Sequence, residues 1–266
     1  MFNRHTLFLL VLSLLSWIVQ ANPDIIRRII PFETTKDVLI INCGAIFSYL
    51  MTYMIVAGLF EYTNPNEKTK ERTEGMYKQI ALSTQSIVLC VCYAILWMYY
   101  VDPLLPYYGY YDVHEYSVVE FLKNLFCYLF IFDTWFYFTH RLMHLRSPIN
   151  FWKHFHMTHH QFVDDTTAFA QDAVHWVEAI LQGPMGHNLI FVLVPMHPIA
   201  GQVFGFLTSV YAIGAHDGRM FDFNNHIKHH HFVSVNYGLY WGFWDYVFGT
   251  RWTDGKYVHA NKLGSD

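Results

Sequence analysis

Eight histidines fall into three short clusters in the second half of the chain. Within each cluster the histidines are one, three or four residues apart, and the clusters are His140 and His144; His156, His159 and His160; and His226, His229 and His230. Residues three and four apart lie on one face of a helix, so each cluster can direct two or three imidazole rings toward one point. Imidazole binds iron, copper, zinc and nickel. Because eight imidazoles are too many for one ion, the pattern predicts two metal ions close together.

Chance spacing and a zinc-hydrolase site are the two alternatives for these histidines. A single His-x-x-x-His pair on a helix is more often incidental than a metal site, but three clusters beside membrane-length apolar runs are not expected by chance. The chain contains no His-Glu-x-x-His sequence, which would supply the general base of a zinc hydrolase. Neutral histidine ligands leave the charge of the metal largely uncompensated, which favours a strongly oxidising centre with open positions for O₂. We therefore expect an oxidising metal centre and not a hydrolytic one.

The composition indicates that the chain is embedded in a membrane, so that apolar segments must position these histidines. Hydrophobic residues make up 53% of the 266 residues and charged residues only 14%, whereas soluble domains carry about 25% charged residues. The formal net charge is −4, and the chain has no basic stripe that could neutralise phosphates, which argues against nucleic-acid binding. The protein is therefore expected to be membrane-embedded.

Five apolar runs are candidates for membrane segments, each of which needs about 20 residues to span the bilayer. The runs are Thr6–Val19, Val38–Phe60, Ile80–Tyr100, Val118–Phe138 and Leu189–Ile213. The first is short and its end resembles a signal-peptide cleavage site, so both an uncleaved anchor and a cleaved signal remain open. The last contains Pro195 and Pro198, which break helices, and it is predicted to form a hairpin of two short helices or a re-entrant pair.

Basic residues in the loops predict the orientation. Residues 61–79 contain four Lys and Arg and residues 101–117 contain none, so the first loop is expected on the cytoplasmic side and the second in the lumen. His140 and His216 would then both lie on the cytoplasmic side. We therefore predict an all-α membrane protein with about four transmembrane helices and a cytosolic histidine-rich helical cap. The predicted domains are an N-terminal membrane anchor and helical hairpin (1–117), a catalytic domain (118–252) and a C-terminal tail (253–266).

The histidine clusters are part of a longer pattern that covers Phe130–Trp252, about half of the chain, and ends with Asn236–Gly238 and Trp244–Thr250. This pattern resembles the fatty acid hydroxylase/sterol desaturase superfamily of membrane di-iron oxygenases. The resemblance implies two iron ions as cofactor, O₂ as co-substrate, and electrons from NAD(P)H through cytochrome b5 or a similar carrier as a separate partner. It also implies a membrane lipid substrate and a multi-pass protein of the endoplasmic reticulum membrane.

Three further residues are predicted to be catalytic. His175, with Glu178 three residues later, resembles a His-Pro-x-Asp/Glu element of the family, although Trp176 replaces the proline. His216, in a His-Asp-Gly stretch, resembles sterol C5-desaturases; these two histidines are expected to bind metal or support a ligand, or else to cap or pack. Asp133 lies inside an apolar run, where a carboxylate is energetically expensive and therefore a functional candidate. It would orient a metal-bound imidazole or make a salt bridge or a hydrogen bond within the helix.

The predicted reaction is O₂-dependent hydroxylation or desaturation of a membrane lipid, which share their first step. The stretches His216–Gly218 and Asn236–Gly238 resemble sterol-acting members, so a sterol is the favoured substrate, through C5 desaturation or C4-methyl oxidation. Asp133–Trp135 is similar to sphingoid-base C4-hydroxylases, and a fatty acyl hydroxylase is a further alternative. The alternative of another class is a non-enzymatic metal-binding or transporting membrane protein. Transporters carry ionisable residues within their spans, whereas these histidines follow the apolar runs, which favours an enzyme.

Overall fold

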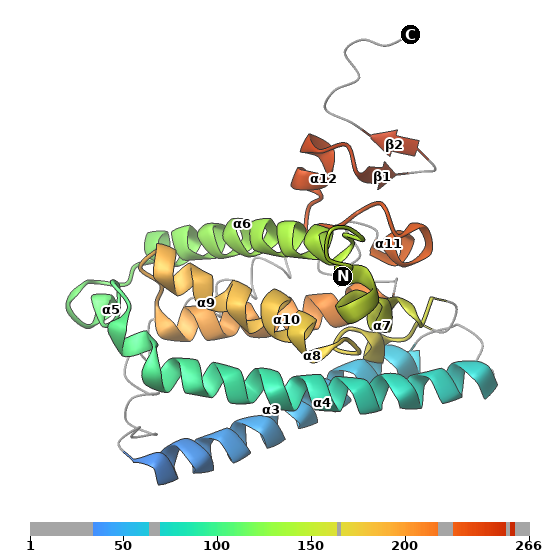
Figure 1. Ribbon diagram of the computed structural model, residues 1–266. Helices are drawn as coiled ribbons and strands as arrows, with labels where there is room; N and C mark the ends of the chain where they lie inside the picture. The colour runs from blue at the N-terminus through green and yellow to red at the C-terminus, as the bar shows by residue number, and fades with distance from the viewer. Residues whose placement is uncertain (1–33, 64–69, 164–165, 218–225, 254–255, 259–266) are drawn as a thin grey trace, which may run out of the picture.

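The computed structural model describes most of the chain, as residues 34–63, 70–163, 166–217, 226–253 and 256–258. Thr6–Val19, for which an anchor and a signal peptide were both predicted, lies outside the described residues. The α-helices, shown in Figure 1, are α3 (Thr35–Thr63), α4 (Lys70–Tyr100), α5 (Tyr110–Val113), α6 (Val118–Met143), α7 (Met157–His160), α8 (Trp176–Gln182), α9 (Pro184–Leu193), α10 (Pro198–Asp217), α11 (His226–Phe232) and α12 (Phe243–Val247). The other elements are the short helical turns η1 (Asp102–Leu104), η2 (Trp152–His156) and η3 (Ala168–Ala170), and the antiparallel strands β1 (Arg251–Thr253) and β2 (Lys256–Val258). The predicted all-α class is confirmed for the described residues, apart from this small hairpin.

Three of the described helices are long and apolar enough to cross a membrane. They are α3, α4 together with η1, and α10. The predicted runs Val38–Phe60 and Ile80–Tyr100 lie within the first two, each of which extends beyond its run. Helix α6 corresponds to a further predicted span, but Glu120, Lys123 and Asp133 make it more polar. The predicted count of about four transmembrane helices is therefore not confirmed.

The predicted break in the last apolar run lies between α9 and α10. Helix α9 ends at Leu193 and α10 begins at Pro198, which needs no amide hydrogen at the start of a helix. Between them, the amide of His197 donates to Oδ1 of Asn124 on α6 (3.1 Å), and Nδ2 of Asn124 donates to the carbonyl of Pro195 (3.0 Å). Two helices therefore form as predicted. The second is longer than the expected short helix, because it continues for 20 residues to Asp217.

Two hydrophobic clusters hold the helices together. The first joins α6, α9 and α10 through buried residues such as Phe132, Ile190 and Phe204. The second joins α3, α4 and η3 through residues such as Tyr53 and reaches α10 at Ile213. In Figure 1, α9 and α10 lie between α6 and the α3–α4 pair, while α7 and α11 lie at the opposite end of the bundle from α5. The histidine-bearing helices therefore gather at one end of the bundle.

Polar contacts attach the α3–α4 pair to the segment that leads to η3. Nη2 of Arg72 on α4 pairs with Oε2 of Glu61 on α3 at 2.8 Å, and both side chains are largely buried. Nη1 of Arg72 donates to the carbonyl of Thr166 (2.9 Å). Oε1 of Gln79 accepts from the hydroxyl and the amide of Thr167, at 2.6 and 3.2 Å. These contacts fix the membrane helices to the part of the chain that contains η3 and α8.

Candidate metal centre

The structure gathers nine histidines into two compact groups. The first group comprises His140, His144, His156, His160 and His229, and the second comprises His159, His216, His226 and His230. Within each group, one nitrogen atom of every ring lies within 4.8 Å of those of the others. All eight histidines of the three sequence clusters are therefore brought together with His216, in the two groups that two metal ions would require.

The ends of two long helices contribute three of these rings. His140 lies in the last turn of α6, and His144 is the residue that ends this helix. His216 lies in the last turn of α10. Because the hydrophobic cluster between α6 and α10 fixes these helices against each other, it also fixes the separation of the two groups.

Two short helices divide their histidines between the groups. The π-helical turn η2 ends at His156 and runs directly into α7; π turns are rare and frequently occur at functional sites. His156 and His160 join the first group, whereas His159 joins the second. On α11 the division is reversed, with one ring in the first group and two in the second. Each of these two three-histidine clusters therefore contributes rings to both groups, and not to one common point as the sequence spacing predicted.

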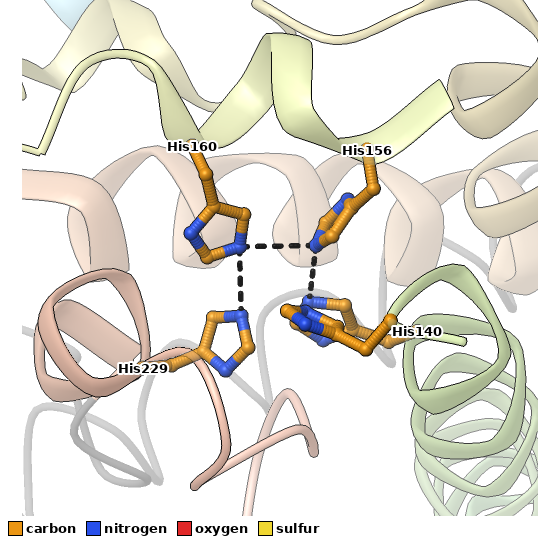
Figure 2. Close-up of side chains that lie close together, drawn as sticks. His140, His156, His160 and His229 are labelled. Carbon is orange, nitrogen blue, oxygen red and sulfur yellow. Dashed lines mark hydrogen bonds between the residues drawn. The ribbon is translucent and has the colours of Figure 1, made fainter. Parts of the chain in front are cut away.

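The first group has the dimensions of a metal site, as Figure 2 shows for four of its rings. The Nε2 atom of His156 lies 3.2 Å from Nε2 of His140 and 3.0 Å from Nε2 of His160. Nε2 of His160 lies 3.0 Å from Nε2 of His229. Two imidazole nitrogens bound to one metal at right angles, at the usual bond length, lie about 3.0 Å apart. The spacing of the rings is therefore that of ligands to a common ion.

Hydrogen bonds that Nδ1 donates to backbone carbonyls leave the Nε2 lone pairs of this group facing inward. Nδ1 of His140 donates to the carbonyl of Tyr237 (2.8 Å), and Nδ1 of His229 donates to the carbonyl of Val235 (2.7 Å). A carbonyl oxygen only accepts, so Nδ1 carries the hydrogen and Nε2 of the neutral ring keeps a lone pair. Nε2 of His144 is buried and has no hydrogen-bond partner among the described residues. A bound cation would satisfy these nitrogens, so the residues of the first group fit a metal ion.

The second group shows the same arrangement. Nδ1 of His216 donates to the carbonyl of Ala212 (2.7 Å), and its Nε2 lies 3.3 Å from Nε2 of His159. The ring of His230 lies 4.6 Å from that of His159, and the ring of His226 lies 4.9 Å from that of His216, between ring centres. Both ring nitrogens of His230 are buried without a hydrogen-bond partner in the described part of the chain. The second group therefore also fits a metal ion.

The electrostatics of the groups keep the rings neutral. Burial, reinforced by the neighbouring imidazoles, holds the pKa values of His156, His229 and His230 well below the ordinary value of 6.5. The same causes lower the pKa of His160 to about 3. Neutral imidazole is the form that binds metals, and an all-imidazole donor set suits iron, copper or zinc. The groups are therefore ready to bind a cation at neutral pH.

Glu178 supports the first group from outside. Its Oε1 lies 2.7 Å from Nδ1 of His156, and both side chains are almost completely buried. Burial raises the pKa of Glu178 well above its usual range. A carboxylate that accepts from the second nitrogen of a metal-binding histidine fixes the orientation of the ring and raises its basicity. The sequence pattern indicated Glu178 only as a companion of His175; the signal that could have singled it out is a lone acid in the apolar stretch 176–181.

Asp133, one of the predicted catalytic residues, does not touch a histidine of either group. Its Oδ1 accepts from the amides of Leu239 and Tyr240, at 2.9 and 2.8 Å. Asp245 accepts from the amide of Tyr237 at 2.8 Å. The two buried carboxylates therefore hold the segment 237–240, which begins with the carbonyl that accepts the hydrogen bond from His140. Asp133 is placed as a positioning residue.

The structure separates His175 from both groups. Its Nδ1 accepts from the amide of Val177 (3.2 Å), so His175 caps the start of α8. His154 and His231, which lie beside the ligand candidates in sequence, are exposed. Of the three residues predicted as catalytic, only His216 therefore lies among the grouped histidines.

A cavity of about 390 Å³ connects both groups with the membrane helices. Its wall contains rings of the first and second groups, including His140 and His216. It also contains apolar side chains of α4 and α6, such as Val91, Phe132 and Phe136. An apolar molecule in this cavity would therefore lie against the histidines.

Comparison with known proteins agrees with this geometry. Residues 125–250 match the model of the family described as fatty acid hydroxylase. The chain is 29% identical over 166 residues to human (Homo sapiens) lathosterol oxidase. This alignment covers 55% of this chain and 53% of that protein. It is 33% identical over 131 residues to a Delta(7)-sterol-C5(6)-desaturase of Nicotiana tabacum, covering 46% of this chain and 47% of the relative. It is 26% identical over 152 residues to sphinganine C4-monooxygenase 2 of Arabidopsis thaliana, covering 51% and 57%. No solved structure matches the chain.

The chain spans about half the length of the curated relatives it matches. These relatives are named as an oxidase, a desaturase and a monooxygenase, all of which are oxidoreductases, and they include sterol and sphingoid-base enzymes. The matched region contains all nine grouped histidines. The resemblance inferred from the histidine clusters is thus confirmed, because residues 125–250 match the fatty acid hydroxylase family model and the relatives include sterol desaturases and sphinganine monooxygenases.

Proposed function

We propose that the protein is a membrane oxidoreductase that uses two histidine-bound iron ions and O₂ to hydroxylate or desaturate a membrane lipid. The observation that carries the proposal is the pair of histidine groups in the wall of an apolar cavity between membrane-length helices. The family match and the names of the relatives support the same class of reaction.

Bound iron would supply the oxidising power for breaking an unactivated C–H bond, because no side chain is strong enough to do so. The residues of the chain would perform the remaining tasks. The carbonyls of Tyr237 and Val235 hold two rings of the first group in the tautomer that exposes Nε2, and Glu178 does so for His156. The apolar cavity wall would exclude water from the lipid carbon that lies against the histidines.

The favoured substrate is a sterol, through C5 desaturation or C4-methyl oxidation. The names of two relatives, lathosterol oxidase and a sterol C5(6)-desaturase, support this choice. Hydroxylation of a sphingoid base at C4 is the alternative, because sphinganine C4-monooxygenases also match the chain. Electrons would come from NAD(P)H through cytochrome b5 or a similar carrier, and the protein would reside in the endoplasmic reticulum membrane. These assignments extend the family resemblance to the whole protein.

The test compares metal content and turnover in matched variants of the full chain. The protein is purified in nanodiscs, its metals are measured by mass spectrometry, and O₂ consumption is followed with sterol or sphingoid-base lipids in the presence of NAD(P)H, cytochrome b5 and its reductase. We expect two irons per chain in the wild type, loss of iron and turnover in His229→Ala, and retention of both in His231→Ala, which alters an exposed neighbour on the same helix. Stoichiometric zinc or copper without lipid turnover would instead support a non-enzymatic metal-binding protein. Sterol and sphingolipid profiles of cells with and without the gene would identify the substrate.

A further inference from the structure

The cavity beside the metal centre contains a polar site that the histidines do not explain. Gln171 and Asp172 lie in the short segment between η3 and α8, and both line the cavity. Asp172 is close enough to act electrostatically on Tyr49 of α3 and Cys90 of α4, which line the same cavity. The polar site therefore lies between membrane-length helices, in a wall that is otherwise largely apolar.

The hydrogen bonds of this pair leave two acceptors unused. Nε2 of Gln171 donates to Oδ1 of Asp172 at 3.1 Å. Oε1 of Gln171 and Oδ2 of Asp172 are buried, and neither has a hydrogen-bond partner among the described residues. An unpaired buried oxygen is destabilising, and a buried carboxyl group more so. These oxygens lie on neighbouring residues and each can accept a hydrogen bond, so they indicate a site for a ligand that brings a donor.

We propose that Gln171 and Asp172 anchor a hydroxyl group of the lipid substrate. The inference rests on the proposed function and narrows its substrate class. A lipid hydroxyl donates to a carboxyl or amide oxygen, whereas a plain hydrocarbon segment leaves both oxygens unpaired. A sterol carries a hydroxyl group on an otherwise apolar skeleton, and a sphingoid base carries two hydroxyl groups beside an amino group at one end of an apolar chain, whereas an unsubstituted fatty acyl chain carries no hydroxyl group. Because the anchor and the histidine groups share one cavity, the anchored hydroxyl would determine which carbon faces the metal centre.

The raised pKa of Asp172 and its lack of an ion pair among the described residues agree with a role in ligand binding. Burial raises the pKa of Asp172 to about 7, so both forms of the carboxyl group are present near neutral pH, and either form accepts from a hydroxyl group. Asp172 also makes no ion pair within the described residues. Replacing Asp172 with Leu removes an unpaired acid oxygen but also leaves Nε2 of Gln171 without its acceptor, so the two effects oppose each other and the variant is expected to fold.

The test measures lipid binding separately from turnover. Binding of radiolabelled probes to the metal-loaded protein in nanodiscs is measured for two pairs of lipids that differ in their hydroxyl groups: cholestanol with cholestane, and sphinganine with octadecylamine. The variants are Asp172→Leu and, as a smaller replacement, Asp172→Ala. The control is Gln202→Leu on α10, which removes a polar side chain from another part of the same cavity wall. Metal content and Tm are recorded for every variant.

We expect the wild type and Gln202→Leu to bind the hydroxylated member of at least one pair about tenfold to a hundredfold more tightly, as one hydrogen bond to a carboxyl group would give. In Asp172→Leu and Asp172→Ala this preference should fall to less than threefold, with metal content unchanged. The pair that shows the preference identifies a sterol or a sphingoid base. Equal binding of both members of each pair by the wild type, or an intact preference in both Asp172 variants, would overturn the proposal. These results do not depend on turnover, so they are distinguishable from a failure of the oxidoreductase function.

Discussion

Replacing Glu178 should weaken the first metal site selectively. In Glu178→Leu, the side chain keeps a similar volume but loses the oxygen that lies 2.7 Å from Nδ1 of His156. This Nδ1 is buried, because the side chain of His156 is 0% exposed, so its hydrogen would have no acceptor. The ring would then be free to adopt the other tautomer or to rotate away from its partners. His156 belongs to the first histidine group only, so the second group should be unaffected.

The magnitude follows from the single hydrogen bond that is lost. Leaving a buried donor unpaired costs about 1–3 kcal/mol, and removal of a partner that orients a metal ligand lowers metal affinity about 10- to 100-fold. Each tenfold loss corresponds to about 1.4 kcal/mol, so the two estimates agree. Glu178→Gln keeps an acceptor oxygen at the same distance from the backbone. We therefore expect this matched variant to lose less than about tenfold in affinity.

The assay is chelator competition on the protein in nanodiscs, with metal content measured at each chelator concentration. The wild type should lose its two ions over a narrow range, whereas Glu178→Leu should lose one ion at a chelator concentration about 10- to 100-fold lower and retain the other. Unchanged metal retention in Glu178→Leu would refute the role assigned to the hydrogen bond. Equal losses in Glu178→Leu and Glu178→Gln would show that the charge of Glu178, and not its hydrogen bond, is what matters.

Three further predictions concern stability and the assignment of roles. Asp133→Leu leaves two buried backbone amides without an acceptor, at about 1–3 kcal/mol each, so thermal unfolding should shift to markedly lower temperature, while Asp133→Asn should retain most of the stability. His175→Ala removes a helix cap, which should lower the unfolding free energy by about 1 kcal/mol without changing the measured metal content; loss of an ion would instead make His175 a ligand. In the folded protein the pKa of Asp172 is about 7, above the ordinary value of 3.8. Between pH 3.8 and pH 7 the folded state therefore keeps a proton on Asp172 that the unfolded state has lost. The stability of the wild type consequently falls as the pH rises through this window. The Tm of Asp172→Leu relative to that of the wild type should therefore rise from pH 4 to pH 7 and remain constant above it; a Tm difference independent of pH would contradict the reasoning.

The grouping of the histidines in the candidate metal centre was largely predictable because its information is local. Histidines at spacings of three and four residues identify one face of a helix, and this rule found every member of the first group. The second group includes His216, which only the family resemblance suggested. The prolines at positions 195 and 198 likewise predicted the break between α9 and α10, because a missing amide hydrogen acts within one turn of its own residue. Because these features act within a turn or two of their own residues, predicting them does not require knowledge of the tertiary structure.

Features that depend on distant partners were not predictable in the same way. Glu178 meets His156 across 22 residues, and Asp133 meets the amide of Leu239 across 106 residues. A lone acid in an apolar stretch is consistent with a metal-supporting residue and with a backbone anchor, and only the fold assigns one role to each. For His175 the motif left two roles open, a ligand or its support and a helix cap, and in the structure its ring caps α8.

The sharing of α7 between both histidine groups has a mechanical consequence. His159 and His160 are neighbours in the chain but belong to different groups, so any shift of this short helix would displace rings of both groups together. Adding or deleting a single residue there would rotate the following rings by about 100° and exchange the ligands of one ion for those of the other. Surface loops tolerate changes in length, whereas this segment would tolerate none. A one-residue insertion within α7, before His159, should therefore weaken the binding of both ions together, with no variant of this kind that loses only one.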